Sequence, residues 1–291
     1  MSNSSNHSHN HSNSIRQVQQ ILPSRSTSDG DGVRIQRTLG QHRHDMDPFL
    51  MLDEIRSLDS ADYVGGFPPH PHRGIETLTY MLAGGFVHED NMGHREELRD
   101  GGAQWMSSGR GVIHSELPLI HEGLLHGFQL WINLPAAQKM QAPAYKQAKR
   151  EELPEVTLAN STLLRSFGGR WDIAGKTLAS PLDHFSANAR ALDVNLPANT
   201  VLEIAVPYDD TVLAYVFEGT LVTENKNIER QNVVRYNKGD TVQLQAGNNG
   251  VRLLLLTGTP LGEPIAQHGP FVMNTEAEIQ QAIEDYRTGN F

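Results

Sequence analysis

The chain has 291 residues, of which 38% are hydrophobic, enough for one large core or two medium ones. The net charge of −10 is spread without a basic stripe, so direct binding of nucleic acid is not expected. The sequence has no cysteine, which excludes disulfides and thiolate metal sites, and no apolar run approaches the roughly 20 residues of a membrane span.

The first residues are rich in serine, asparagine and histidine and have no apolar stretch typical of a secretion signal. We therefore expect residues 1–30 to be a disordered polar tail and the protein to be cytoplasmic. His7, His9 and His11 alternate in this tail and could bind a metal loosely, although a plain polar tail is the favoured interpretation.

Short, β-branched hydrophobic segments, with 15 prolines and 26 glycines, favour an all-β fold. In chain order, strands are expected at 33–39, 49–52, 75–82, 86–90, 103–106 and 128–134. Near the end, Thr275 and Glu278 form a capping box, helical spacing follows, and Gly289 is typical of a C-cap. We expect one helix there, docked on a barrel.

Two short stretches each carry a pair of metal-capable side chains two residues apart: His70 with His72, and His114 with Glu116. On a strand, residues i and i+2 point to the same face. Three imidazoles and a carboxylate would hold a mononuclear transition metal and leave positions open for exchangeable ligands. Counting by twos from His70 also places Glu76 on this face, so spacing alone does not choose between Glu76 and Glu116.

The second half contains a copy of part of the first. Residues 79–89 align with 214–224, so that Tyr80 matches Tyr215 and Gly84 matches Gly219. This repeat predicts two related β-barrel domains, at 31–150 and 151–291, joined by a charged linker at 146–155.

The two copies differ at the paired side chains. The same offset places Ala205 and Pro207 where the first copy has His70 and His72. Gly101 and Gly109 match Gly239 and Gly247 at similar spacing, which puts the second pair near Arg252 and Leu254, unless a shorter loop has deleted it. We therefore expect a metal only in the N-terminal domain.

Several long motifs are similar to the pirins. They are His70-Pro71-His72-Arg73-Gly74-x-Glu76-Thr77, His88-Glu89-Asp90-x-x-Gly93-His94, Gln104-Trp105-Met106-x-x-Gly109-Arg110-Gly111-x-x-His114-x-Glu116, Gln129-Leu130-Trp131-x-Asn133-Leu134 and Gln267-His268-Gly269-Pro270-Phe271-Val272-Met273-Asn274. The resemblance spans roughly Val33 to the C-terminus. It implies a bicupin: two antiparallel, jelly-roll-like β-barrel domains, the second with the terminal helix and without metal.

The resemblance also implies a ligand set: His70, His72, His114 and Glu116. Iron(II) is the expected metal, with Mn, Ni, Co, Cu and Zn as alternatives. General cupins instead use the glutamate that follows the His-x-His pair, here Glu76. The pirin pattern selects Glu116 and leaves Glu76 as a pocket or supporting residue.

Some pirins resemble quercetin 2,3-dioxygenases, which open a flavonol ring with O2 and release carbon monoxide. That implies a small aromatic substrate, a metal that lowers the pKa of its hydroxyl, and Glu116 as the general base. The alternative is a metal-dependent, redox-sensing regulator that binds a protein partner, as animal pirins do, although no nuclear import signal is present. A monomer is expected. His88, His94 and His126 are expected to serve as wall or supporting residues, and Trp105, Trp131 and Phe128 as core.

Overall fold

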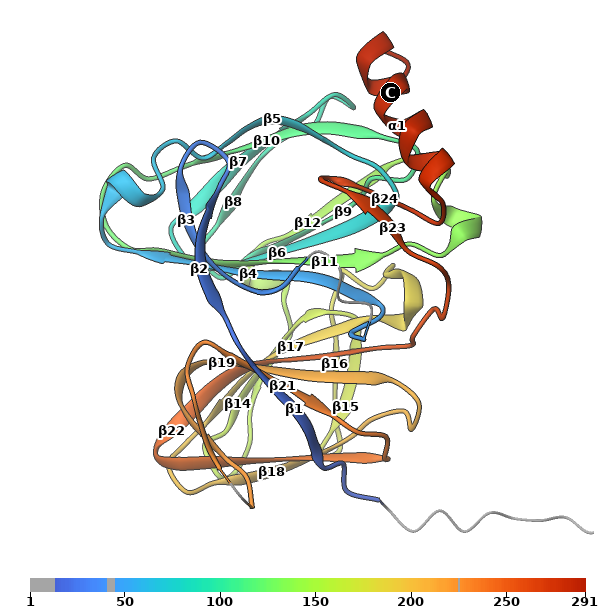
Figure 1. Cartoon of the computed structure of the whole chain (residues 1–291). Helices are drawn as coiled ribbons and strands as arrows, with labels where there is room; N and C mark the ends of the chain where they lie inside the picture. Colours follow the sequence, from blue (N-terminus) through green and yellow to red (C-terminus); the bar gives the residue numbers. More distant parts are fainter. Residues whose placement is uncertain (1–13, 41–44, 225) are drawn as a thin grey trace, which may run out of the picture.

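The computed structural model describes residues 14–40, 45–224 and 226–291, so the alternating histidines of the N-terminal tail lie outside the described residues. Two antiparallel β units are stacked one above the other, with a helix at the C-terminal end (Figure 1). The sheets are jelly-roll-like rather than fully closed. This confirms the all-β bicupin expectation.

The N-terminal unit is a seven-stranded sheet facing a four-stranded sheet. The larger sheet has the order β12–β9–β6–β11–β4–β3–β2, and the smaller has the order β5–β10–β7–β8. The strands are β2 (Arg25–Asp29), β3 (Val33–Leu39), β4 (Phe49–Ser57), β5 (Phe67–His72), β6 (Ile75–Ala83), β7 (Gly85–Asp90), β8 (Arg95–Arg99), β9 (Ala103–Ser107), β10 (Val112–Pro118), β11 (Leu125–Asn133) and β12 (Ala144–Ala148). The six strands expected from the sequence are all present, although β4 runs five residues further than expected and β11 begins three residues earlier.

The C-terminal unit is one nine-stranded sheet that folds over because β22 serves both of its layers. The first part of β22 pairs with β18, and its second part pairs with β17 and β19. Its strands are β1 (Val18–Pro23), β13 (Glu155–Thr157), β14 (Leu163–Gly168), β17 (Arg190–Leu196), β18 (Val201–Ala205), β19 (Thr211–Val222), β20 (Asn227–Glu229), β21 (Asn232–Tyr236) and β22 (Thr241–Gly258), with a separate hairpin of β15 (Arg170–Ile173) and β16 (Lys176–Ala179).

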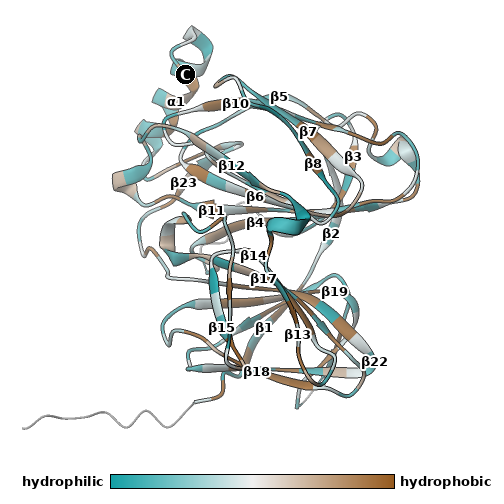
Figure 2. Cartoon of the chain, turned by 180° about the vertical axis from the view of Figure 1, so that it is seen from behind, coloured by the Kyte–Doolittle hydropathy of each residue, from teal (hydrophilic) through white to brown (hydrophobic). Residues whose placement is uncertain are grey.

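The apolar cores explain which unit can hold polar chemistry. The interior of the C-terminal unit is a cluster of buried apolar residues, and β19 and β22 carry long hydrophobic segments (Figure 2). A second cluster lies between the units, where Tyr80 stacks on Phe167 with ring centroids 4.3 Å apart. The interior of the N-terminal unit instead contains buried Thr79, Gln104 and Glu116.

The register of the strands supports the internal repeat. Tyr80 lies opposite Phe128 on β11, and Tyr215 lies opposite Leu254 on β22, so the two tyrosines occupy equivalent places. The sequence offset misplaced the counterpart of the second pair, however. The strand equivalent to β10 is the first part of β22, which pairs with β18 from Thr241, and not the region of Arg252 and Leu254. Different loop lengths in the two copies cause the error.

The two ends of the chain are exchanged between the units. Strand β1 pairs with β21 of the C-terminal unit, and β2 pairs with β3 of the N-terminal unit. The expectation of a disordered tail up to residue 30 is therefore wrong for 18–29. Leu22 is buried, Val18 and Ile21 pack against the C-terminal core, and the backbone of β1 is paired, which together offset the polar composition. The linker was also placed too early, because Lys146 and Gln147 belong to β12.

The C-terminal segment packs on the N-terminal unit. It comprises β23 (Ala266–His268), β24 (Phe271–Met273) and α1 (Glu276–Thr288). As predicted, Thr275 caps α1 through a capping box and Gly289 ends it with φ of 77°. Lys139 Nζ donates to the carbonyls of Gly74 at 2.9 Å and Val272 at 2.8 Å, which ties the segment down. Among the described residues, no helix has the length and hydropathy needed to cross a membrane.

Candidate metal centre

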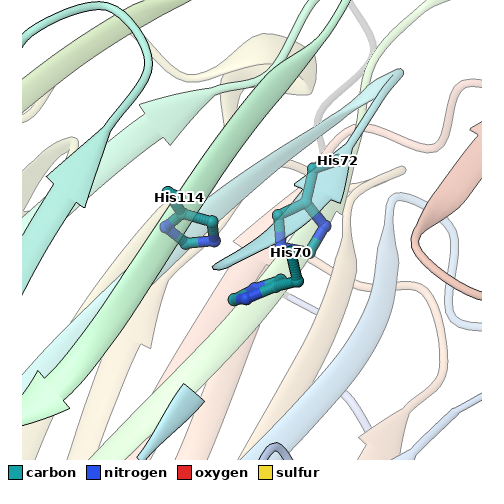
Figure 3. Close-up of side chains that lie close together, drawn as sticks. All are labelled: His70, His72 and His114. Atoms are coloured by element: carbon teal, nitrogen blue, oxygen red, sulfur yellow. The ribbon is translucent and has the colours of Figure 1, made fainter. Parts of the chain in front are cut away.

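Strands β5 and β10 bring three histidines together. They pair antiparallel with His114 directly opposite His70, and His72 follows two residues later on β5. The ring centroid of His114 lies 4.4 Å from that of His70 and 5.0 Å from that of His72. One nitrogen from each ring lies within 4.8 Å of the other two, and the rings converge from both strands (Figure 3).

The sequence of β5 explains why it lies at the edge of the four-stranded sheet. Pro68, Pro69 and Pro71 have no backbone N–H, and such residues are confined to edges and bulges. The pairing with β10 shifts between His114 and Glu116, beside the first two prolines. The irregular pairing therefore falls inside the site itself.

The imidazole nitrogens are available as ligands. His70 Nδ1 lies 2.8 Å from the carbonyl of Pro68, which can only accept, so Nδ1 carries the proton and Nε2 is free in the neutral ring. Both nitrogens of His72 and Nε2 of His114 are buried without a hydrogen-bond partner among the described residues. Burial, and then the neighbouring histidines, hold the pKa of His72 and His114 well below the usual value, which favours neutral rings.

Glu116 lies beside this trio rather than within it. Its carboxylate accepts hydrogen bonds from Gln104 Nε2 and Gln129 Nε2, each at 2.7 Å, and from Thr79 Oγ1 at 3.4 Å. It shares a second group of candidate ligands with His114 and His88. The structure thus places Glu116 near one of the three histidines and does not bring all four expected ligands within 4.8 Å of one another.

Glu76 points away from the histidines, so the expectation that it shares their face is wrong. The chain turns at Gly74, with φ of 81°, and passes from the four-stranded sheet into the seven-stranded one. The Glu76 carboxylate accepts from the backbone N–H of Ser186 at 3.0 Å, in the C-terminal unit. Burial raises the pKa of Glu76 to about 8, although the bonds from Ser186 oppose this.

A chain of polar contacts runs from the histidines to the surface. His114 Nδ1 lies 3.4 Å from His88 Nδ1, and His88 Nε2 lies 3.1 Å from Asp90 Oδ2. The same oxygen lies 2.8 Å from His94 Nδ1, and the His94 side chain is 40% exposed. The ring of Tyr145 stacks on both His88 and His94. His126, by contrast, bonds Glu54 away from this site.

A cavity of about 610 Å³ opens beside His70 and His72. Its other lining residues are Asp29, Gly30, Asp31, Arg37, Gly40, Met51, Asp53, Phe67, Pro68, Gln129, Trp131, Gln267, Gly269 and Pro270. Trp131 thus forms a wall of the cavity and meets His72 edge to face at 5.1 Å, whereas Phe128 and Trp105 belong to the core between the units.

Sequence reasoning missed the residues that hold Glu116 and the share of the C-terminal segment in the cavity. Thr79 and Gln104 are polar residues at inward positions of otherwise apolar strands, a signal that could have identified them. The contribution of Gln267 and Pro270 had no comparable signal, because it depends on the exchange of the chain ends.

Fold and site together define a two-domain cupin protein with a histidine-lined centre in its N-terminal unit. Residues 32–132 match the Pirin family and residues 191–291 match the Pirin C-terminal cupin domain. The chain belongs to the pirin family.

Full-length relatives agree with this assignment. A Vibrio cholerae protein that carries the provisional name quercetin 2,3-dioxygenase is 45% identical, covering 95% of this chain and 98% of its own length. Pirin of Homo sapiens is 36% identical, with 94% and 93% covered. The crystal structure of a quercetin 2,3-dioxygenase from Acinetobacter baumannii is 30% identical, with a TM-score of 0.86 and 96% and 99% of the two chains covered.

Proposed function

We propose that this protein is a metal-dependent dioxygenase that acts on a flavonol such as quercetin. One observation carries the proposal: three histidines with free ring nitrogens converge beside a 610 Å³ cavity. Relatives named for quercetin dioxygenase activity support it at the level of the family.

The residues present fit a divalent transition metal. A buried nitrogen without a partner costs roughly 1–3 kcal/mol, and His72 and His114 both carry such nitrogens. Coordination by His70, His72 and His114 would satisfy them, with Glu116 as the fourth ligand. Imidazole suits iron, copper, nickel and zinc, and we propose iron(II).

The cavity suits a small aromatic molecule. Its volume lies within the roughly 300–1,000 Å³ typical of ligand pockets. Met51, Phe67 and Trp131 offer apolar surface, and Gln129 is a polar group on the wall nearest Glu116. Such a mixture fits a flat polyphenol.

The bound metal would supply Lewis acidity toward a substrate hydroxyl and a redox partner for O2. In this proposal Glu116 accepts the proton of that hydroxyl, while Gln104 and Thr79 hold the carboxylate in place. The carboxylate lies one hydrogen bond behind the cavity wall, because Gln129 lines the cavity and donates to Oε2.

The test begins with metal analysis of the protein as isolated, followed by quercetin absorbance under air and under nitrogen. We expect bound iron and an oxygen-dependent loss of absorbance that His114→Ala abolishes. His121→Ala, which removes an exposed histidine outside the cluster, is the control and should behave as wild type. Iron without turnover would overturn the dioxygenase proposal and favour a metal-dependent regulator that binds a protein partner.

A second comparison examines the carboxylate. Glu116→Gln should lower both metal content and turnover, whereas Glu76→Gln should leave metal content unchanged, because Glu76 bonds Ser186 on the other side of the sheet. Full metal content and full turnover in Glu116→Gln would exclude Glu116 as ligand and as base.

A further inference from the structure

We propose that His88 and Asp90 are positioning residues that fix the tautomer of His114, so that its Nε2 faces the metal site as a bare nitrogen. The inference rests on the proposed metal site. The sequence suggested only a general supporting role for His88 and none for Asp90.

The carboxylate of Asp90 can only accept hydrogen bonds. Oδ1 accepts from the backbone N–H groups of Met92 at 2.9 Å and His94 at 3.0 Å, which fixes the orientation of the carboxylate. Oδ2 is then left for the rings of His88, at 3.1 Å, and His94, at 2.8 Å. Both ring nitrogens must therefore carry a hydrogen, and for His88 this is Nε2.

The tautomer of His88 determines that of His114, because their rings are in contact. A neutral His88 that is protonated on Nε2 has a bare Nδ1, which can only accept. That nitrogen faces His114 Nδ1 at 3.4 Å, so the hydrogen between them belongs to His114. A neutral His114 protonated on Nδ1 has a bare Nε2, the atom that is buried without a partner.

The surroundings keep this arrangement in place. His88 and the Asp90 side chain are fully buried, and the ring of Tyr145 stacks on His88 with centroids 4.5 Å apart. The Tyr145 hydroxyl donates to Gln147 at 2.9 Å, so the ring that stacks on His88 is itself held in place. Carboxylates and carbonyls that orient a metal-binding imidazole in this way raise metal affinity.

The contacts from Asp90 through His88 to His114 make Asp90→Asn a more specific test than Asp90→Ala, because only Asp90→Asn should reverse the tautomers. An Asn that keeps its oxygen on the two backbone N–H groups would point its NH2 at His88 Nε2. His88 would then carry its hydrogen on Nδ1, His114 would accept it, and the hydrogen of His114 would move to Nε2. Asp90→Ala only removes the constraint, so its effect should be smaller than that of Asp90→Asn.

Nitrogen-15 NMR of the metal-free protein reads the tautomers directly. We expect His114 protonated on Nδ1 and His88 on Nε2 in wild type, and both reversed in Asp90→Asn. His94→Ala is the matched control, because it removes a ring from the same carboxylate and leaves the His88 contact intact. Wild-type His114 protonated on Nε2, or a doubly protonated His88, would overturn the proposal.

Chelator competition with Fe(II) or Ni(II) provides the second measurement. His88→Ala and Asp90→Asn should weaken binding about 10–100-fold, with little change in His94→Ala. Equal loss in Asp90→Ala, Asp90→Asn and His94→Ala would indicate a general structural role and contradict the inference. Thermal unfolding verifies that each variant is folded. The tautomers of the wild-type protein are measured without any substitution, so that part of the test does not depend on a variant that folds. The tautomers are measured without turnover. Failure of the tautomer proposal can therefore be told apart from failure of the dioxygenase proposal.

Discussion

The hydroxyl of Tyr80 donates a 2.9 Å hydrogen bond to Asp193, across the boundary between the two units. Its repeat partner, Tyr215, donates in the opposite direction to Glu54 at 2.7 Å. Each carboxylate also meets a basic residue of its own unit, Arg252 for Asp193 and His126 for Glu54. The repeat has therefore kept a reciprocal pair of contacts between the units, although Ala205 and Pro207 stand where the first copy has His70 and His72.

Replacing either tyrosine with phenylalanine should weaken these contacts. Burial raises the pKa of both tyrosines, so both remain protonated donors. We expect Tyr80→Phe and Tyr215→Phe each to cost about 1.5–3 kcal/mol of unfolding free energy, the range for hydrogen bonds to charged groups. Urea unfolding gives the value, and a loss below about 0.5 kcal/mol, the usual range of surface substitutions, would contradict the expectation.

Gly74 makes the corner that separates the histidines from β6. Its φ is 81°, and an added Cβ would lie 2.0 Å from the carbonyl oxygen of Val272. Gly74→Ala should destabilise the protein and loosen the C-terminal segment. Gly93→Ala is the control: its φ is 94° and nothing lies within 4 Å, so it carries only the backbone cost of about 1–3 kcal/mol. Equal unfolding free energies for the two variants would show that the close approach is unimportant.

Glu76 should make stability depend on pH. Burial favours the neutral acid and raises the pKa of Glu76 from its ordinary value of 4.5 to about 8. Between these two values Glu76 is protonated in the folded protein and ionised in the unfolded chain. Stability should therefore fall as the pH rises through this window, and Glu76→Gln should flatten the dependence. Denaturant unfolding of the metal-free protein between pH 5 and 8 measures both slopes. Parallel curves for wild type and variant would refute this assignment.

Metal should stabilise the protein through His72 and His114. A ligand that binds only the folded state adds about 2.7 kcal/mol at 100 times its Kd, so Fe(II) or Ni(II) should raise the melting temperature of chelator-treated protein. His72→Ala should abolish the rise. The same variant removes a buried ring that packs on Trp131, so its own melting temperature without metal is the baseline for the rise. An undiminished rise in His72→Ala would remove it from the ligand set.

Local patterns predicted the elements well, because their causes are local. The strand at 33–39 and the capping box of Thr275 follow from residue alternation and from a side chain that meets a nearby N–H. The sequence could also have predicted that His70 and His114 lie close together, since both lie at alternate positions of short strands.

Longer-range features were beyond the sequence. Counting by twos failed at Glu76 because the chain leaves one sheet for another at Gly74, and strand periodicity does not extend around a corner. The polar composition of residues 18–29 hid two strands whose partners lie in different units. The choice of Glu116 came from family resemblance, and its position behind Gln129 depends on packing.

The exchange of chain ends has a consequence for synthesis. Gln267, Gly269 and Pro270 form one wall of the cavity, and Val272 packs against Leu50 and Ile75 of the N-terminal unit. The chain must therefore be synthesised as far as Val272 before the first unit is enclosed. Until then, a nascent chain with its histidines already in place would expose them to any metal in the cell. The wall contributed by Gln267, Gly269 and Pro270 is thus among the last parts of the N-terminal unit to form.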